Sequence, residues 1–542
     1  MQDLGEWDYV IVGAGSAGCV LANRLSQDPD IRVLLLEAGG RDSYHWIHIP
    51  VGYLYCMGNP RTDWCFRTAA EPGLNGRALN YPRGRVLGGC SSINGMIYMR
   101  GQARDYDGWR QLGLTGWGWE DVLPHFRASE DHYQWNDVLH GQGGGLRVEQ
   151  QRLSWDVLDS FREACAETGI PKVDDFNRGD NFGSSYFQVN QKHGIRWNTA
   201  KGFLRPALKR PNLRVVTQAE VTSVLLDGRR ASGVALTVKG QPATATAKGE
   251  VILAAGAVKS PHILELSGIG NPQVLDRIGV TVRHSLPEVG ENLQDHLQLR
   301  TIFKVHGAKT LNQMAGNIFG KARIALEYAL NRSGPMSMAP SQLGVFAKSD
   351  PSFETANIEY HVQPLSLDKF GEPLHPFPAI TASVCNLRPG SRGHVHALTG
   401  HAKDQPEIRP NYLSAAADRQ VAADSIRLTR RIMEAPAMAR YRPEEYLPGP
   451  SLQSDEELAR AAGDIGTTIF HPTSTCRMGA DEASVVDGRL RLRGIEGLRV
   501  VDASVMPLIT SGNTNAPTVM IADKGAAMIR EDRRQGAAIK AA

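Results

Sequence analysis

Three glycines near the start of the chain are the first residues whose types and spacing suggest chemistry. Gly13, Gly15 and Gly18 form the pattern Gly-x-Gly-x-x-Gly directly after the apolar run from Tyr9 to Val12. The first glycine permits a tight turn, the second lets the backbone approach a pyrophosphate, and the third lets a helix pack closely on a strand. The N-terminus of that helix can hold an anion. The pattern therefore predicts a dinucleotide-binding turn.

A carboxylate follows these glycines at the distance that a ribose contact requires. Ala17 to Leu25 has helical spacing, Arg32 to Leu36 is a second apolar strand, and Glu37 closes that strand. An acidic residue about 20 positions after the glycines suits a ribose 2′-hydroxyl. It would repel a 2′-phosphate, so NADP is disfavoured, whereas NAD and FAD both stay open at this point.

Length and charge bound the class of protein. A chain of 542 residues predicts about two to four domains. The hydrophobic share of 42% and the charged share of 22% are ordinary for a globular protein. With 60 basic against 57 acidic residues the net charge is +3, so we expect no nucleic acid partner.

The start of the chain, its apolar runs and its cysteines bear on where the protein is located. The opening stretch MQDLGEWDY lacks a basic start and an apolar core, so we expect no signal peptide. No apolar run approaches the roughly 18 residues of a membrane span, which leaves peripheral membrane association open. Seven cysteines, without zinc-type spacing, favour reduced thiols, a cytoplasmic location and no metal site.

Two longer motifs carry a family resemblance. The stretch from Gly84 to Gly101, GRVLGGCSSINGMIYMRG, combines paired glycines with small hydroxyl residues, so its backbone donors can face a phosphate or an isoalloxazine ring. It resembles the first signature of the glucose-methanol-choline (GMC) oxidoreductases, which are FAD enzymes. The second signature matches Gly256 to Gly270, and Val289 to His296 looks like the next landmark. The resemblance runs from Asp8 to about Met528 and makes FAD, instead of NAD, the expected cofactor.

The resemblance implies a mixed α/β fold, with a Rossmann-like FAD-binding domain interleaved with a sheet-based substrate-binding domain. We expect the FAD-binding domain in residues 1–155, 199–300 and 466–535, and the substrate-binding domain in residues 156–198 and 301–465. The aromatic loop at about 43–80 either covers the flavin or packs as a surface loop. Trp109, Trp117 and Trp119 are interpreted as core residues.

The resemblance also implies the residues that hold FAD. In choline oxidases a histidine bonds covalently to the flavin at the position of Ile93, so we expect noncovalent FAD here. Cys90 occupies a position more often filled by Gly, Ser or Thr. The expected contacts are Gly13, Gly15, Ser16, Ala17, Gly18, Glu37, Ala38, Arg85, Val86, Gly88, Gly89, Ser91, Asn94, Gly95, Met96, Val221, Ala255, Gly256, Asp502, Ala503, Asn515 and Thr518.

The catalytic residues implied by the resemblance are His471 and Asn515. Alcohol oxidation removes the hydroxyl proton and transfers a hydride from carbon to flavin N5. A neutral imidazole is a natural proton acceptor, and an amide can hold the alcohol oxygen without competing for the proton. His262 and His296, which lie in segments that pack around FAD, are interpreted as structural.

The expected activity is oxidation of a primary alcohol, either aliphatic, glycol-ether or aryl, to the aldehyde. Choline dehydrogenase-type activity and a hydroxynitrile lyase with a structural flavin are the alternatives. Gln342 stands where choline-type enzymes carry a glutamate, and Met336, Met338 and Leu343 make that stretch apolar. A trimethylammonium group needs a carboxylate or an aromatic cage, so we expect a neutral alcohol. The electron acceptor, oxygen or a quinone or carrier, stays open.

Overall fold

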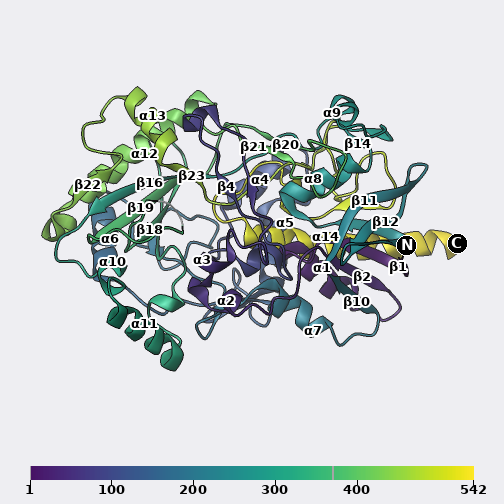
Figure 1. Ribbon diagram of the computed structural model, residues 1–542, viewed down its shortest axis with the longest axis horizontal. Coiled ribbons are helices and arrows are strands. Elements are labelled where there is room, and N and C mark those ends of the chain that lie inside the picture. Colours follow the sequence, from purple (N-terminus) through teal and green to yellow (C-terminus); the bar gives the residue numbers. More distant parts are fainter. Residues whose placement is uncertain (1, 369–370, 542) are drawn as a thin grey trace.

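The two sheets lie in opposite halves of the molecule. The computed structural model describes residues 2–368 and 371–541. Figure 1 shows β1, β2 and β10 in the half that also contains both termini, and β16, β18 and β19 in the other half. The long helix α14 (Asn515–Ala541) runs from the middle of the molecule through the first half.

The first sheet has the order β10-β2-β1-β13-β12-β11, with β24 paired to β13. Its central strands β10, β2, β1, β13 and β24 run parallel, whereas β11, β12 and β13 are antiparallel neighbours. All five residues of β2, Val-Leu-Leu-Leu-Glu, are buried, as expected for a parallel strand covered on both faces. The strands are β1 (Gln2–Val12), β2 (Val33–Glu37), β10 (Leu213–Thr217), β11 (Ala219–Asp227), β12 (Arg230–Val238), β13 (Gln241–Leu253) and β24 (Leu498–Val500).

Helices α1 (Ser16–Leu25) and α14 pack together in the core that forms around this sheet. Helices α4 (Ala103–Gln111), α5 (Trp119–Ser129) and α8 (Gly256–Leu266) complete this half. Trp109 and Trp117 are fully buried and Trp119 packs against the same core, which confirms the expectation for all three residues.

The second sheet has the order β22-β16-β19-β18-β17-β7, with β23 paired to β16, and every pair is antiparallel. One face packs on helices α6 (Asp156–Glu167), α12 (Ala416–Glu434) and α13 (Asp455–Ile465) through residues such as Leu299, Tyr360 and Val384. On the opposite face, β16 carries Gln298 and Arg300, and β18 carries Glu359, His361 and Gln363. The strands are β7 (Gly183–Tyr186), β16 (Leu297–Lys304), β17 (Leu343–Ala347), β18 (Ile358–Gln363), β19 (Ala379–Asn386), β22 (Glu444–Leu447) and β23 (Gly466–Thr468).

The chain alternates between the two sheets, in keeping with the interleaved fold that was expected. Strand β16 begins at Leu297, and β23 continues the second sheet to Thr468, so the expected segment boundaries at 300 and 465 differ from these strands by a few residues. Helix α11 (Ile318–Asn331) lies in the segment expected to form the substrate-binding domain.

The remaining elements are short. The expected lid loop contains α2 (His45–His48), η1 (Pro50–Gly52), α3 (Tyr53–Cys56), β3 (Phe66–Arg67) and η2 (Pro72–Leu74). The others include β4 (Asn80–Tyr81), η3 (Gly89–Ser92), β5 (Glu130–His132), β6 (Leu146–Val148), β8 (Gln191–Lys192), β9 (Ile195–Arg196), η4 (Ala200–Leu204), α7 (Arg205–Ala207), β14 (Ile269–Gly270), α9 (Pro272–Arg277), β15 (His284–Ser285), α10 (Leu311–Met314), η5 (Pro335–Ser337), β20 (His394–His396), β21 (Glu407–Arg409), η6 (Pro436–Tyr441) and η7 (Ala503–Val505). Within the described residues, every helix is too short or too polar to cross a membrane.

Candidate active site

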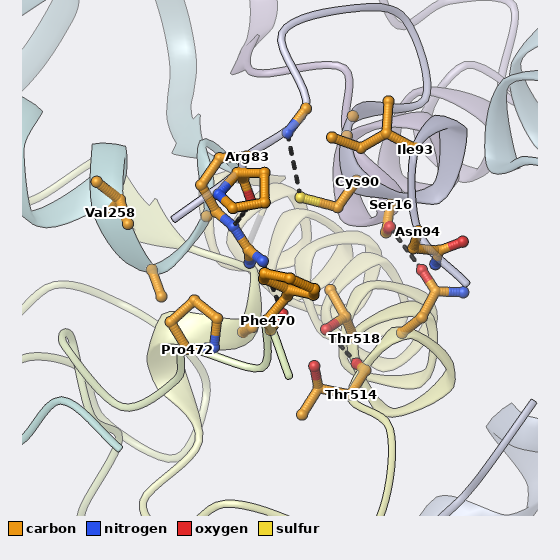
Figure 2. A pocket seen from close by; sticks show the side chains of 18 of the residues that line it. Ser16, Arg83, Cys90, Ile93, Asn94, Val258, Phe470, Pro472, Thr514 and Thr518 are labelled. Atoms are coloured by element: carbon orange, nitrogen blue, oxygen red, sulfur yellow. Dashed lines mark hydrogen bonds between the residues drawn. The ribbon is translucent and has the colours of Figure 1, made fainter. Parts of the chain in front are cut away.

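One cavity is lined both by the ends of the first sheet and by the polar face of the second. Its first part contains the glycine turn after β1, the end of β2 and the start of α14, and its second part contains residues of β16 and β18. Figure 2 shows side chains from distant segments, among them Ser16, Asn94, Phe470 and Thr518, arranged around this space.

The glycine turn brings bare backbone to the cavity wall. Gly13 has a φ of +99°, and a Cβ atom there would lie 2.6 Å from the carbonyl oxygen of Ala254. A Cβ atom on Gly18 would lie 1.8 Å from the Gly13 oxygen, and one on Gly89 would lie 2.6 Å from the Cα atom of Gly15. These approaches exclude any larger residue. They leave backbone donors and the start of α1 facing the cavity, which fits a dinucleotide pyrophosphate.

Glu37 lies at the end of β2, on the cavity wall. Its Oε2 accepts a hydrogen bond from the Ala14 amide at 2.9 Å, and its Oε1 accepts one from the Gly39 amide at 2.8 Å. Burial raises the pKa of Glu37 to about 7, although both amide bonds act in the opposite direction. A carboxylate fixed in this way can accept a further bond from a ribose hydroxyl.

Most of the predicted cofactor contacts lie on the cavity wall. The structure brings together Gly13, Gly15, Ser16, Ala17, Glu37, Ala38, Gly89, Asn94, Gly95, Met96, Val221, Ala255, Gly256, Asp502, Ala503, Asn515 and Thr518. The combination of glycines, buried amides and a carboxylate at the strand end is suited to FAD. Ile93 also lies on this wall.

Five predicted contacts lie outside the cavity lining and stay predictions: Gly18, Arg85, Val86, Gly88 and Ser91. Gly18 packs on Gly13 from behind. The Arg85 guanidinium lies over the Trp64 ring, and Val86 is buried with Ile47 and Cys56. Gly88 donates its amide to Ala14, and the Ser91 hydroxyl donates to Gly88. These residues pack behind the residues that line the cavity.

The start of α14 closes the cofactor part of the cavity. Asn515 is the first residue of the helix, and its Oδ1 accepts a hydrogen bond from the Ser16 hydroxyl at 2.8 Å. Asp502 accepts bonds from the Gly256 amide at 2.8 Å and the Ser260 hydroxyl at 2.6 Å. Asn515 and Thr518, in the first turn of α14, lie on the wall, so the positive end of the helix dipole faces the cavity.

The amide that contacts His471 belongs to Asn513, so the predicted pairing of His471 with Asn515 is corrected. Asn513 Nδ2 lies 3.0 Å from His471 Nε2, whereas the Asn515 side chain is directed to Ser16. Both asparagines stand in the motif Asn-Thr-Asn, two positions apart. Asn515 already belongs to α14 and Asn513 to the preceding loop, and the sequence alone did not locate this helix boundary.

His296 contacts the other side of the His471 ring, which the sequence reasoning missed. The two Nδ1 atoms are 3.1 Å apart, and His296 Nε2 lies 3.2 Å from the carbonyl oxygen of Leu387. Since a carbonyl only accepts, His296 Nε2 carries a proton, and a neutral His296 then accepts at Nδ1 from His471 Nδ1. This assignment of protons leaves the lone pair of His471 Nε2 free toward Asn513.

Both histidines are held neutral by their surroundings. Burial lowers the pKa of His471 well below its usual 6.5, and His296, His361 and Arg83 add to the effect. Burial also lowers the pKa of His296, against the carboxylates of Glu359 and Asp295, which raise it. The network therefore presents a neutral imidazole acceptor at physiological pH.

Asp295 fixes the backbone beside His471. Its Oδ1 accepts from the His471 amide at 2.8 Å, and its Oδ2 accepts from the hydroxyls of Tyr81 at 2.8 Å and Thr468 at 2.6 Å. Phe470 has a φ of +71°, an unfavourable value for a bulky residue. Strain of this kind persists where surrounding contacts determine the conformation.

The lining expected from Met336, Met338 and Leu343 is wrong, because other residues form the second part of the cavity wall. None of the three lies on the wall of the cavity, and Met338 and Leu343 are buried in the core behind the second sheet. Gln342 is also outside the lining, because its Nε2 donates to the Ala339 carbonyl at 2.9 Å. The wall there combines the polar side chains of Gln298, Arg300, His361 and Gln363 with aromatic and apolar ones such as Tyr53, Pro340 and Phe470.

Comparison with known proteins identifies relatives over nearly the whole chain. Residues 7–298 match the N-terminal model and residues 389–522 the C-terminal model of the GMC oxidoreductases. The chain is 42% identical to an alcohol dehydrogenase [acceptor] of Pseudomonas putida, over 96% of this chain and 95% of that protein. It is 39% identical to human mitochondrial choline dehydrogenase, over 97% of this chain and 90% of that protein.

Solved structures give the same result. Pyridoxine 4-oxidase from Mesorbium loti superposes with a TM-score of 0.89 at 32% identity, covering 97% of this chain and 99% of that one. A formate oxidase structure superposes with a TM-score of 0.90 at 26% identity, covering 99% of this chain and all (100%) of that one.

Proposed function

Because the chain belongs to the GMC oxidoreductase family of FAD-dependent, alcohol-oxidising enzymes, we propose that it converts a primary alcohol to the aldehyde with His471 as the base. The observation that carries this proposal is the hydrogen-bonded series from Leu387 through His296 and His471 to Asn513. It supports a neutral His471 with an unprotonated Nε2 atom.

His471 and Asn513 divide the work at the alcohol oxygen. The hydroxyl proton passes to His471 Nε2, and the Asn513 amide donates a hydrogen bond to the oxygen, which becomes more negative as the proton leaves. An amide fits this task because it cannot compete for the proton. The hydrogen bond between His296 and His471 stabilises the imidazolium that forms.

FAD supplies the acceptor for the hydride that leaves the carbinol carbon. The glycine turn, Glu37 and Asp502 are the residues that would hold its dinucleotide part, and the start of α14 would face its ring. We propose noncovalent attachment, since Ile93 offers no nucleophile. The negative charge that collects on the reduced ring is favoured by the helix N-terminus.

The relatives support an alcohol substrate without fixing its identity. One is named an alcohol dehydrogenase and others are named choline dehydrogenases. A hydroxynitrile lyase on this fold would keep the flavin oxidised, so redox change separates the two activities. The electron acceptor is proposed to be oxygen or a quinone or carrier.

Anaerobic mixing of the FAD-loaded enzyme with a panel of primary alcohols tests the proposal. We expect bleaching of the oxidised flavin absorbance and one equivalent of aldehyde per flavin. Subsequent exposure to air or to a soluble quinone identifies the acceptor by the rate of reoxidation. Release of cyanide and aldehyde from hydroxynitriles, with no bleaching by any alcohol, would contradict it.

A further inference from the structure

Arg300 is a buried cation on the wall of the cavity. It lies on β16, where the alternating residues Leu297 and Leu299 face the helix-covered core and Gln298 and Arg300 face the cavity. Its side chain is 8% exposed, and in the described part of the chain neither Nε nor Nη2 has a hydrogen-bond partner. No carboxylate of the described residues lies within ion-pair distance of it.

A carboxylate on the same face of the second sheet, that of Glu359, is paired with another side chain. In the sheet register Arg300 is opposite Ser383, and Ser383 is opposite His361. Glu359 Oε1 lies 3.2 Å from His361 Nε2. Tyr53 is the other titratable group that faces Arg300, and burial raises the pKa of its phenol, so it stays neutral.

Arg300 keeps its charge in this position. Burial lowers its pKa to about 10, which still leaves the guanidinium protonated at neutral pH. A buried, unpaired cation is costly, and proteins normally compensate it with a partner. Since the described residues provide none, the partner is expected to be a molecule that enters the cavity.

We propose that the substrate is an alcohol that also carries a carboxylate, and that Arg300 binds this carboxylate. The inference rests on the proposed alcohol oxidation and specifies its substrate class. A guanidinium matches a carboxylate with two parallel hydrogen bonds, and the amides of Gln298 and Gln363 on the same wall can complete the contact.

Arg300 and His471 both line the cavity, and His296, which contacts His471, lies one residue before β16. Different groups on the wall therefore bind the carboxylate and the hydroxyl. The tests use alcohols that carry these two groups at opposite ends of the molecule.

The positive charge of Arg300 should weaken the binding of choline. A quaternary ammonium group beside Arg300 would bring two positive charges together where burial weakens solvent screening. We therefore expect choline to be a poor substrate, although the cause differs from the one predicted at Gln342.

Matched substrate pairs test the inference. Flavin reduction is measured with 1-hexanol against 6-hydroxyhexanoate, and with benzyl alcohol against 4-(hydroxymethyl)benzoate. We expect the carboxylate member of each pair to have the higher kcat/KM, by roughly 30-fold or more, as for a buried charge pair. The readout is the ratio within a pair, so differences in flavin content cancel.

Variants assign this ratio to Arg300. In Arg300→Met the preference for the carboxylate should be lost, and Arg300→Lys should retain part of it. Arg392→Met is the matched control, because Arg392 lies outside the cavity lining and its Nη1 donates to the carbonyls of Pro389 and Ser391. This control should keep the wild-type ratio.

Binding provides a readout that does not depend on turnover. Hexanoate should perturb the absorbance of the oxidised flavin in the wild type and in Arg392→Met, and should do so only at much higher concentration in Arg300→Met. If neutral alcohols bleach the flavin and the carboxylates gain nothing, the inference is overturned while the proposed function stands. If neither kind of alcohol bleaches it, the proposed function fails first.

Discussion

The two parts of the cavity are built on different principles. The cofactor part is formed by backbone atoms brought close by glycines, with a Gly18 Cβ position only 1.8 Å from a neighbouring oxygen. The substrate part is formed by long polar side chains on alternate positions of β16 and β18. Backbone walls tolerate almost no substitution, whereas a side-chain wall can change without changing the fold. Specificity can therefore vary in the second part while cofactor binding is kept.

The largest expected effect is a loss of flavin reduction without a loss of bound FAD. His471→Ala should slow flavin reduction by roughly a hundred- to ten-thousandfold, the range for a lost general base. FAD should stay bound, because His471 contributes to the substrate side. Stopped-flow absorbance gives the rate and the visible spectrum gives the FAD content. Reduction at the wild-type rate would remove His471 from the mechanism.

The next largest effect is expected from a substitution in the cofactor part of the cavity, which should lower both stability and FAD binding. Gly18→Ala forces a Cβ atom against the Gly13 carbonyl, and the strain should cost about 1–3 kcal/mol in the free energy of unfolding. Loss of bound FAD should accompany it. Gly536→Ala is the control: it lies in α14 with no atom within 4 Å of its Cβ position. Thermal unfolding and FAD content compare the two variants, and equal behaviour would refute the backbone-wall argument.

Asn513 and Asn515 separate the substrate part of the cavity from the cofactor part. Asn513→Ala should lower the reduction rate by roughly tenfold, as for one lost hydrogen bond, with FAD retained. Asn515→Ala should chiefly weaken FAD binding, because it removes the contact with Ser16. Each variant is assayed for both the reduction rate and the FAD dissociation constant. The opposite assignment of effects would restore the pairing predicted from the sequence.

The smallest expected effect concerns pH. Burial raises the pKa of Glu37 to about 7 from 4.5, and a ribose hydroxyl that donates to it favours the ionised form. The affinity for FAD should therefore rise severalfold between pH 6 and pH 8, as the competing proton leaves. Glu37→Gln, which cannot ionise, should show a flatter profile. Titration of apoprotein with FAD measures both, and identical profiles would exclude this role of Glu37.

The sequence predicted the cofactor part well because its signals are local. The strand, the glycine turn, α1 and Glu37 follow one another within 30 residues, and each glycine has a steric reason. The contacts of Arg300 and His361 depend on strand register between β16, β19 and β18, which lie far apart in sequence. The role of His296 depends on a ring contact with His471 across 175 residues. Neither relation leaves a local pattern.

Two errors have a common physical cause. The pairing of Asn515 with His471 and the lining role of Gln342 both required the direction of a side chain near the end of an element. Helix and strand boundaries decide such directions, and one or two residues of uncertainty reverse them. Secondary structure alone therefore does not assign a functional role to residues at these ends.

The cofactor wall joins segments that are hundreds of residues apart, from the glycine turn at 13–18 to the residues around Asp502 and Asn515. Any ligand that binds only this assembled arrangement stabilises the folded state in proportion to the logarithm of its free concentration. Each tenfold increase in free FAD above its dissociation constant should add about 1.4 kcal/mol. The cellular supply of flavin thereby helps to determine what fraction of the enzyme is folded.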